Sequence, residues 1–213
     1  MRRASFTISP AIDNDGIAAA QSASAAGYLT LNGALVSGGK WSVSGYGQKV
    51  AVTSVGVDTG ITFTVYGKDV DGKATTEVLT GTSASAVTTS AYYKEVSSVL
   101  ASGATNNTVK VGLVALSASP TYVVNYKMEN FKASLAEIVS GTINGTCQHT
   151  FDDIFASTWT EAGATWFPHD AASLSAFTAN QDANYAFPPT ACRTIVNTAS
   201  SGSAITFVVI VPA

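Results

Sequence analysis

From residue 49 onward, apolar and hydroxyl residues alternate along short stretches of the chain. Residues 50–55 and 61–66 show this pattern most clearly. A period of two places successive side chains on opposite faces of an extended backbone, so these stretches predict half-buried β-strands. Further strands are expected at residues 75–80, 92–99, 108–114 and 121–127. Because no long helical pattern separates them, they predict an all-β fold, either an antiparallel β-sandwich or a barrel, jelly-roll-like in type.

Two aspartate- and glycine-rich segments are interpreted as polar turns. Asp71-Gly72 supplies the positive φ that a tight hairpin needs, so the strand at 75–80 is the expected partner of the strand at 61–66. Both this segment, from Asp69, and the segment from Asp13 begin like a calcium-binding EF-hand loop. That loop requires a glutamate at its twelfth position, where this chain has Thr80 and Ser24.

The second half of the chain has a different character. Residues 133–144 predict either one long strand or a short helix and a strand. Residues 151–189 read as a loop-rich stretch that gathers eight aromatic side chains, Phe151, Phe155, Trp159, Trp166, Phe167, Phe177, Tyr185 and Phe187. Strands at 192–197 and 204–211 follow. The last is almost continuously apolar, so we expect both of its faces to be covered, by its own fold or by a neighbouring subunit.

The N-terminal segment leaves two possibilities open. Residues 17–27 are rich in alanine and could form a short helix that ends at Gly27, or an extended arm. We divide the chain into an N-terminal arm with a first strand (1–48), a β-sandwich or barrel module (49–130) and a second β region with the aromatic loop and the C-terminal strands (131–213).

Charge is scarce and unevenly distributed. Only 12% of the 213 residues are charged, about half the share usual in a globular domain, whereas 24 Ser and 26 Thr are present. Residues 1–132 carry 10 basic and 8 acidic side chains, and residues 133–213 carry 1 and 6. The hydrophobic content of 46% argues against intrinsic disorder, the composition against a coiled coil, and the net charge of −3 against a general nucleic-acid binder.

The sequence shows no apolar segment of the length that a secretory signal or a membrane helix requires. We therefore expect no membrane partner and synthesis in a cytoplasm. Cys147 and Cys192 lie 45 residues apart, without a CxxC pair, and are interpreted as two buried thiols, although one disulfide between them stays possible.

Metal binding and catalysis are weakly supported. Cys147 and His149 lie in a cluster with Asp152, Asp153 and His169 and would share one face of a strand. Asp152 or His169 could add a third ligand, but no known ligand spacing matches. The chain has no GxSxG nucleophile elbow, P-loop or dinucleotide fingerprint, and its two histidines lie in no recognisable catalytic frame. We expect no enzyme activity, cofactor or metal.

The aromatic loop has two interpretations. Trp159, Trp166 and Tyr185 could stack on sugar rings, as in a carbohydrate-binding module or an adhesin. The favoured interpretation is a cluster that lies in the core or at an interface between chains. The candidate interface residues are Trp159, Trp166, Phe167, Tyr185, Phe187 and Phe207.

A resemblance covers about a quarter of the chain. A hairpin of the form G-x-D-x-x-G-x-x-x-x-E-x-L-x-G runs from Gly67 to Gly81, and Tyr92-Tyr93-Lys94 opens a strand of the form Y-[YF]-K-x-V-x-S-V. Together they resemble a β module of tailed-bacteriophage structural proteins. The resemblance implies a non-enzymatic virion protein, assembled in the host cytoplasm, and carries no functional residue over.

Within that class, a capsid decoration (cement) protein is the leading hypothesis, and a tail, neck or fibre-attachment component is the alternative. The expected partners are the major capsid protein, other virion proteins and further copies of the chain, in a homo-oligomer that would be a trimer. The composition agrees with this hypothesis, because lysine and glutamate lose much side-chain entropy when ordered and are depleted from interface cores.

Overall fold

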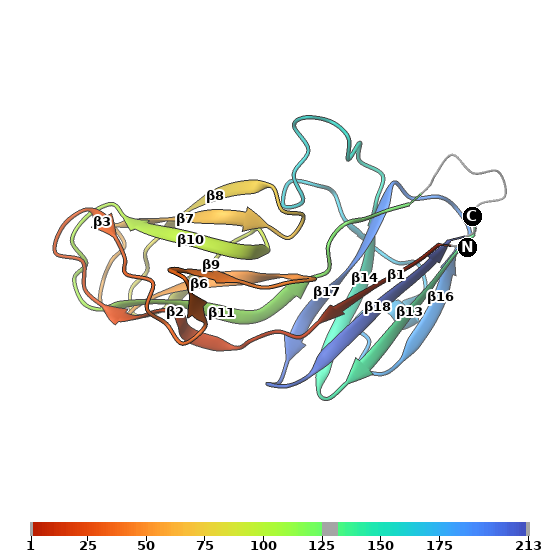
Figure 1. Ribbon diagram of the computed structural model, residues 1–213, viewed down its shortest axis with the longest axis horizontal. Coiled ribbons are helices and arrows are strands. Elements are labelled where there is room, and N and C mark those ends of the chain that lie inside the picture. The colour runs from red at the N-terminus through yellow and green to blue at the C-terminus, as the bar shows by residue number, and fades with distance from the viewer. Residues whose placement is uncertain (1, 125–131, 212–213) are drawn as a thin grey trace. The chain divides into compact units, whose positions relative to one another are not determined.

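The computed structural model describes residues 2–124 and 132–211, and within them regular structure consists of β-strands and one three-residue 3-10 helix (Figure 1). The all-β prediction is confirmed. All the strand pairs are antiparallel, and the sheets of the described residues remain open at their edges, so the structure is of the sandwich kind and not a closed barrel. No helix of these residues is long and apolar enough to cross a membrane.

The chain forms two compact units. Unit 1 comprises Met1–Pro10 and Ala115–Ala213, and unit 2 comprises Ala11–Val114. These bounds differ from the three segments expected from the sequence, because the first strand pairs with the last strand of the chain. Pairing between strands 200 residues apart leaves no trace in local composition.

Unit 2 contains the strands of the first half of the chain. They are β2 (Asp13–Gln21), β3 (Gly27–Tyr28), β4 (Val36–Ser37), β5 (Lys40–Ser42), β6 (Gly47–Ser54), β7 (Thr62–Asp69), β8 (Ala74–Thr80), β9 (Ala86–Thr88), β10 (Tyr93–Ala101) and most of β11 (Val109–Ala118). One layer joins β8, β7 and β10, and the other joins β9, β6, β11 and β2. Apolar side chains of both layers, among them Val52, Phe63 and Val96, form one core cluster.

The predicted hairpin is confirmed. Every residue of β8 pairs with β7, from Lys68–Ala74 to Thr62–Thr80. Gly72 closes the turn with φ 89°, and the Asp69 carboxylate accepts a hydrogen bond from the Lys73 backbone N–H at 2.8 Å. The Tyr92–Val99 strand of the phage-like pattern corresponds to β10, which pairs with β7 on its other edge.

The alternative in which residues 17–27 form a short helix is wrong. This segment contributes to β2, which pairs with β11 through Val109–Gln21 and Val111–Ala18. Alanine favours a helix intrinsically, but tertiary packing overrides this weak preference. Ile17 and Ala18 lie fully buried in the core cluster of unit 2, which supplies the stabilisation that an isolated helix would lack.

Unit 1 contains the first strand and the second half of the chain. Its elements are β1 (Arg2–Ile8), β12 (Tyr122–Val123), β13 (Ala133–Ser140), β14 (Ile143–Thr150), β15 (Phe167–Pro168), the 3-10 helix η1 (Ala172–Leu174), β16 (Gln181–Tyr185), β17 (Ala191–Ala199) and β18 (Ala204–Val211). The predicted strand at 121–127 includes β12, and its residues 125–127 lie outside the described residues. Residues 133–144 form a strand that ends at Ser140, a turn at Gly141 and the start of β14.

The strands of unit 1 form two layers. One is the sheet β1-β18-β13-β16, which we call sheet A, and the other joins β15, β14, β17 and β12. β13 pairs with β18 in sheet A, and β14 and β17, which both lie between them in the sequence, pair with each other in the second layer. The turns that follow β13 and β17 therefore connect the two layers. A core cluster that includes Leu135, Cys147, Phe207 and Val209 fills the space between the layers.

The apolar last strand is covered at its edges by its own chain. β18 pairs with β1 from Arg2–Val211 to Ile8–Ile205 and with β13 from Ser134–Ile210 to Ser140–Ala204. Ile205, Phe207, Val209 and Val211 are buried. Val208, which is also buried, and Ile210, which is partly buried, lie on the opposite face of sheet A.

Candidate functional site

The candidate site is built around a buried histidine at the end of β14. His149 pairs with Phe167 of β15 on one side and with Cys192 of β17 on the other. Its imidazole contacts three phenylalanine rings, with centroid distances of 5.2 Å to Phe151, 6.0 Å to Phe167 and 5.7 Å to Phe187. Three separate segments of the chain therefore converge on one ring.

The three phenylalanines themselves form an exposed surface. Phe151 lies 6.2 Å from Phe167 and 5.9 Å from Phe187 between ring centroids. The exposed fractions are 54% for Phe151, 46% for Phe167 and 36% for Phe187. We call Phe151, Phe167 and Phe187 the aromatic patch. Contiguous exposed apolar side chains of this size are typical of binding surfaces, whereas apolar residues that lie singly on a surface are ordinary.

Beneath the aromatic patch lies a second histidine. The ring of His169 lies 6.5 Å from that of His149 and 4.5 Å from that of Tyr185. Burial lowers the pKa of both histidines below the usual value, and the nearby Asp170 carboxylate opposes this shift. Both imidazoles are therefore held neutral under conditions in which exposed histidines begin to protonate.

The structure gives little support to a metal site. Cys147 and His149 share a face of β14, as expected, but Cys147 lies in the core of unit 1. The backbone N–H of Ala171 donates to Nδ1 of His169, so the proton of this neutral imidazole lies on Nε2 and neither nitrogen offers a lone pair to a metal. In the described ranges, no three histidine, cysteine or acidic side chains come together as metal ligands.

The predicted interface residues are placed in four environments. Phe167 and Phe187 belong to the exposed aromatic patch, and Trp159 is half-buried in a turn where its backbone N–H donates to Ala156. Tyr185 and Phe207 lie inside the core cluster of unit 1. The sixth residue, Trp166, is half-buried in a different arrangement.

Trp166 packs against a buried ion pair. The guanidinium of Arg193 lies 3.9 Å from the centroid of the indole ring and forms a salt bridge with Glu161, and its Nε donates to Gln148 at 2.9 Å. The indole N–H donates to the Glu161 backbone oxygen at 3.0 Å. One face of Trp166 is thus occupied by the only basic residue of 133–213. This arrangement leaves less of the ring available for stacking on a sugar.

A carboxyl group and two thiols are buried in the core of unit 1. Glu137 is fully buried, accepts a hydrogen bond from the Thr194 hydroxyl and forms no ion pair with any described residue. Burial raises the pKa of Glu137 to about 8, and the pKa values of the Cys147 and Cys192 thiols are also raised, chiefly by burial. Both cysteines are free thiols, as favoured from the sequence.

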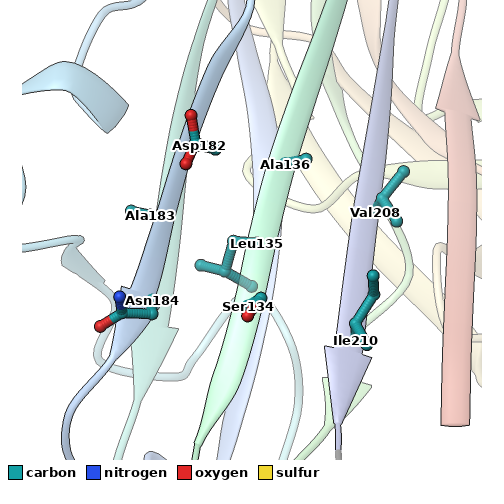
Figure 2. Close-up of a pocket in the computed structure, with 8 residues that line it drawn as sticks. All are labelled: Ser134, Leu135, Ala136, Asp182, Ala183, Asn184, Val208 and Ile210. Carbon is teal, nitrogen blue, oxygen red and sulfur yellow. The ribbon is translucent and has the colours of Figure 1, made fainter. Parts of the chain in front are cut away.

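The outer face of sheet A is hollowed (Figure 2). The hollow has a volume of about 270 Å³. Its lining residues come from β13, β16 and β18 and are Ser134, Leu135, Ala136, Asp182, Ala183, Asn184, Val208 and Ile210. One wall is apolar and the other is polar, with a single charged side chain, Asp182.

Comparison with known proteins identifies no relative: no protein-family model, no curated protein and no solved structure matches this chain. The site must therefore be interpreted from its own geometry.

Three of its features were missed from the sequence. Phe151 belonged to the predicted aromatic cluster but not to the predicted interface residues. The salt bridge between Glu161 and Arg193 joins residues 32 positions apart, and no local sequence pattern predicts it. The burial of Glu137 could have been predicted from the sequence, because alternation along β13 places Glu137 on the same face as Leu135.

Proposed function

We propose that this chain is a non-enzymatic structural protein of a tailed-bacteriophage virion, and that it acts as a capsid decoration protein. In this role it binds the major capsid protein and stabilises the shell by burying apolar surface in many copies. The observation that carries the proposal is the aromatic patch, in which the exposed Phe151 contacts both Phe167 and Phe187 at one place on unit 1. Full burial of such side chains contributes about 1.5–3 kcal/mol each.

Two further observations support an assembly role. Lysine and glutamate are scarce throughout the chain, and this scarcity lowers the entropic cost of ordering its surface at an interface. The hairpin and strand that resemble a phage structural module are paired side by side as β8, β7 and β10. A tail or neck component remains the alternative, because it would use the same kind of surface.

The number of copies per particle tests the proposal. Densitometry of purified virions should give several hundred copies for a decoration protein and about a dozen for a tail component. Particles that lack the protein should resist heat and chelators less well than complete particles. Unchanged resistance, or a protein absent from the particle, would contradict the decoration role.

A matched pair of variants connects the function to the aromatic patch. The double variant Phe167→Ser, Phe187→Ser should bind particles at least about tenfold more weakly, because two exposed apolar contacts are lost. Val78→Ser is the control, since Val78 in unit 2 is 60% exposed and loses apolar surface without touching the aromatic patch. Far-UV circular dichroism verifies that both variants are folded. Equal binding by both variants would show that the aromatic patch is not the particle-binding surface.

A further inference from the structure

Strand register brings several segments of unit 1 to a common end. Ala133 at the start of β13 pairs with Tyr185 at the end of β16, and Arg2 at the start of β1 pairs with Val211 at the end of β18. β14 ends at the same side, because the turn between β13 and β14 lies at the other. We call this the patch end, since the chain continues from β14 into Phe151 and from β16 toward Phe187.

Acidic side chains border the aromatic patch at this end. Asp152 and Asp153 directly follow Phe151, and Asp170 lies close enough to His149 and His169 to raise the pKa of both. Asp153 and Asp170 are exposed. Asp152 is partly engaged, since it accepts a hydrogen bond from the Thr165 backbone N–H at 2.6 Å.

Basic side chains lie at the same end, on the strands of sheet A. Arg2 and Arg3 open β1, and Lys132 immediately precedes β13. All three are exposed, whereas Arg193 is buried in its ion pair. In the described part of unit 1, these three are the exposed basic residues. One end of the unit therefore carries the aromatic patch with its acidic border and, on the strands of sheet A, three exposed basic residues, which we call the basic border.

We propose that the patch end is a self-complementary interface between copies of this chain. In a symmetric contact, the acidic border of one copy faces the basic border of the next, and the aromatic patch is buried between them. A second copy fits this surface because both signs of charge lie at one end of the same unit. The inference rests on the proposed assembly role and makes a second copy the partner of the aromatic patch. The patch then supports particle binding indirectly, by joining copies that bind the shell together, and its test requires no virion.

Charge reversal tests the interface. Arg3→Asp and Asp170→Arg each place like charges across the contact, so each purified variant should self-associate at least tenfold more weakly than the wild type in sedimentation velocity. An equimolar mixture of the two should recover association, because each reversed charge then meets an opposite charge on the other copy. Asp170 suits this test because its side chain is exposed, and Asp15→Arg in unit 2 makes the same change in charge at another exposed position as a control.

The outcomes separate this inference from the proposed function. A wild-type chain that stays monomeric at about 100 µM overturns the inference, as does a mixture that associates no better than its components. Loss of particle binding in Phe167→Ser, Phe187→Ser, with self-association unchanged, assigns the aromatic patch to another virion protein and also overturns it. Recovery in the mixture supports the interface even if the protein proves absent from virions, and that absence contradicts the proposed function alone.

Discussion

The two units use the same restricted composition in different ways. The core cluster of unit 2 consists of aliphatic and aromatic side chains such as Val52, Phe63 and Val99. The core of unit 1 includes two thiols and encloses the carboxyl group of Glu137, which accepts a hydrogen bond from Thr194 but forms no ion pair with any described residue. Unit 2 also buries carboxyl groups, but Asp58 and Asp69 accept hydrogen bonds from the backbone N–H groups of Asn106 and Lys73. Glu137 of unit 1 has no such backbone donor among the hydrogen bonds of the described residues, and burial raises its pKa to about 8.

The surfaces differ in the opposite sense. Unit 2 exposes scattered large apolar residues, namely Ile12, Tyr28, Val55, Val57 and Val78. Among the described residues, every exposed phenylalanine lies in unit 1, and one of them, Phe151, contacts two others. A unit that holds polar groups inside and aromatic groups outside is organised for binding at the expense of its own stability.

The largest expected effects come from truncating one core at a time. Phe63 in unit 2 and Phe207 in unit 1 are both fully buried, and each change to alanine should lower the free energy of unfolding of its own unit by about 3–5 kcal/mol. The two residues belong to separate core clusters. Chemical denaturation should therefore show the unfolding transition of unit 2 shifted in Phe63→Ala and that of unit 1 shifted in Phe207→Ala.

Thiol labelling distinguishes the two units directly. Cys147 and Cys192 are buried in unit 1, and burial raises their pKa values, so they should react with alkylating agents only when this unit opens. Phe207→Ala should accelerate labelling, whereas Phe63→Ala should leave the labelling rate unchanged. Equal acceleration by both variants would mean that the units unfold as one.

Two ion pairs offer a second contrast between the units. Arg193→Met in unit 1 should lower the free energy of unfolding by about 3–5 kcal/mol, because it leaves Glu161 charged and 1% exposed. Lys40→Met in unit 2 should cost at most about 1 kcal/mol, since Lys40 is 48% exposed and Glu95 keeps Lys68 at 3.4 Å. Urea denaturation measures both. A cost for Lys40→Met that matches that of Arg193→Met would contradict this distinction between buried and exposed pairs.

Much of the fold could be predicted from the sequence, because its signals are local. Alternation predicted the strand at 61–66 and its neighbours, and Asp71-Gly72 predicted the turn that joins β7 to β8. The N-terminal segment was harder, since alanine suits a helix and a buried strand equally well. Only its pairing with β11 decides between them, and that pairing joins residues about 90 positions apart.

The candidate site was predicted in part, for a similar reason. Aromatic residues concentrated in the loop indicated where a binding surface could lie, but not which rings would face solvent. Phe187 and Tyr185 are two positions apart, yet one is exposed and the other is buried in the core. Tyr185 is the last residue of β16 and Phe187 lies beyond it, which explains their different exposure. No residue of the loop indicates where that strand ends.

The last contrast concerns the carboxyl group in the core of unit 1, and its effect develops gradually with pH. Folding raises the pKa of Glu137 from its usual 4.5 to about 8, so the unfolded chain ionises this group between these values while the folded unit keeps it protonated. Its contribution to stability is fully present below pH 4.5 and is lost as pH rises toward 8, by about 1.4 kcal/mol per pH unit. Glu137→Gln, which cannot ionise, should therefore gain stability relative to the wild type between pH 5 and pH 8.

The two buried histidines change stability with pH in the opposite direction to Glu137. Comparing wild type with Glu137→Gln cancels their contribution. Burial lowers the pKa of His149 and His169, so the stability that they contribute is lost as pH falls below their usual value of 6.5. Wild type and Glu137→Gln share this loss, and the difference between their unfolding free energies therefore reports Glu137 alone. A difference that stays constant from pH 5 to pH 8 would mean that the buried carboxyl group ionises without cost, and the distinction between the two cores would then rest on packing alone.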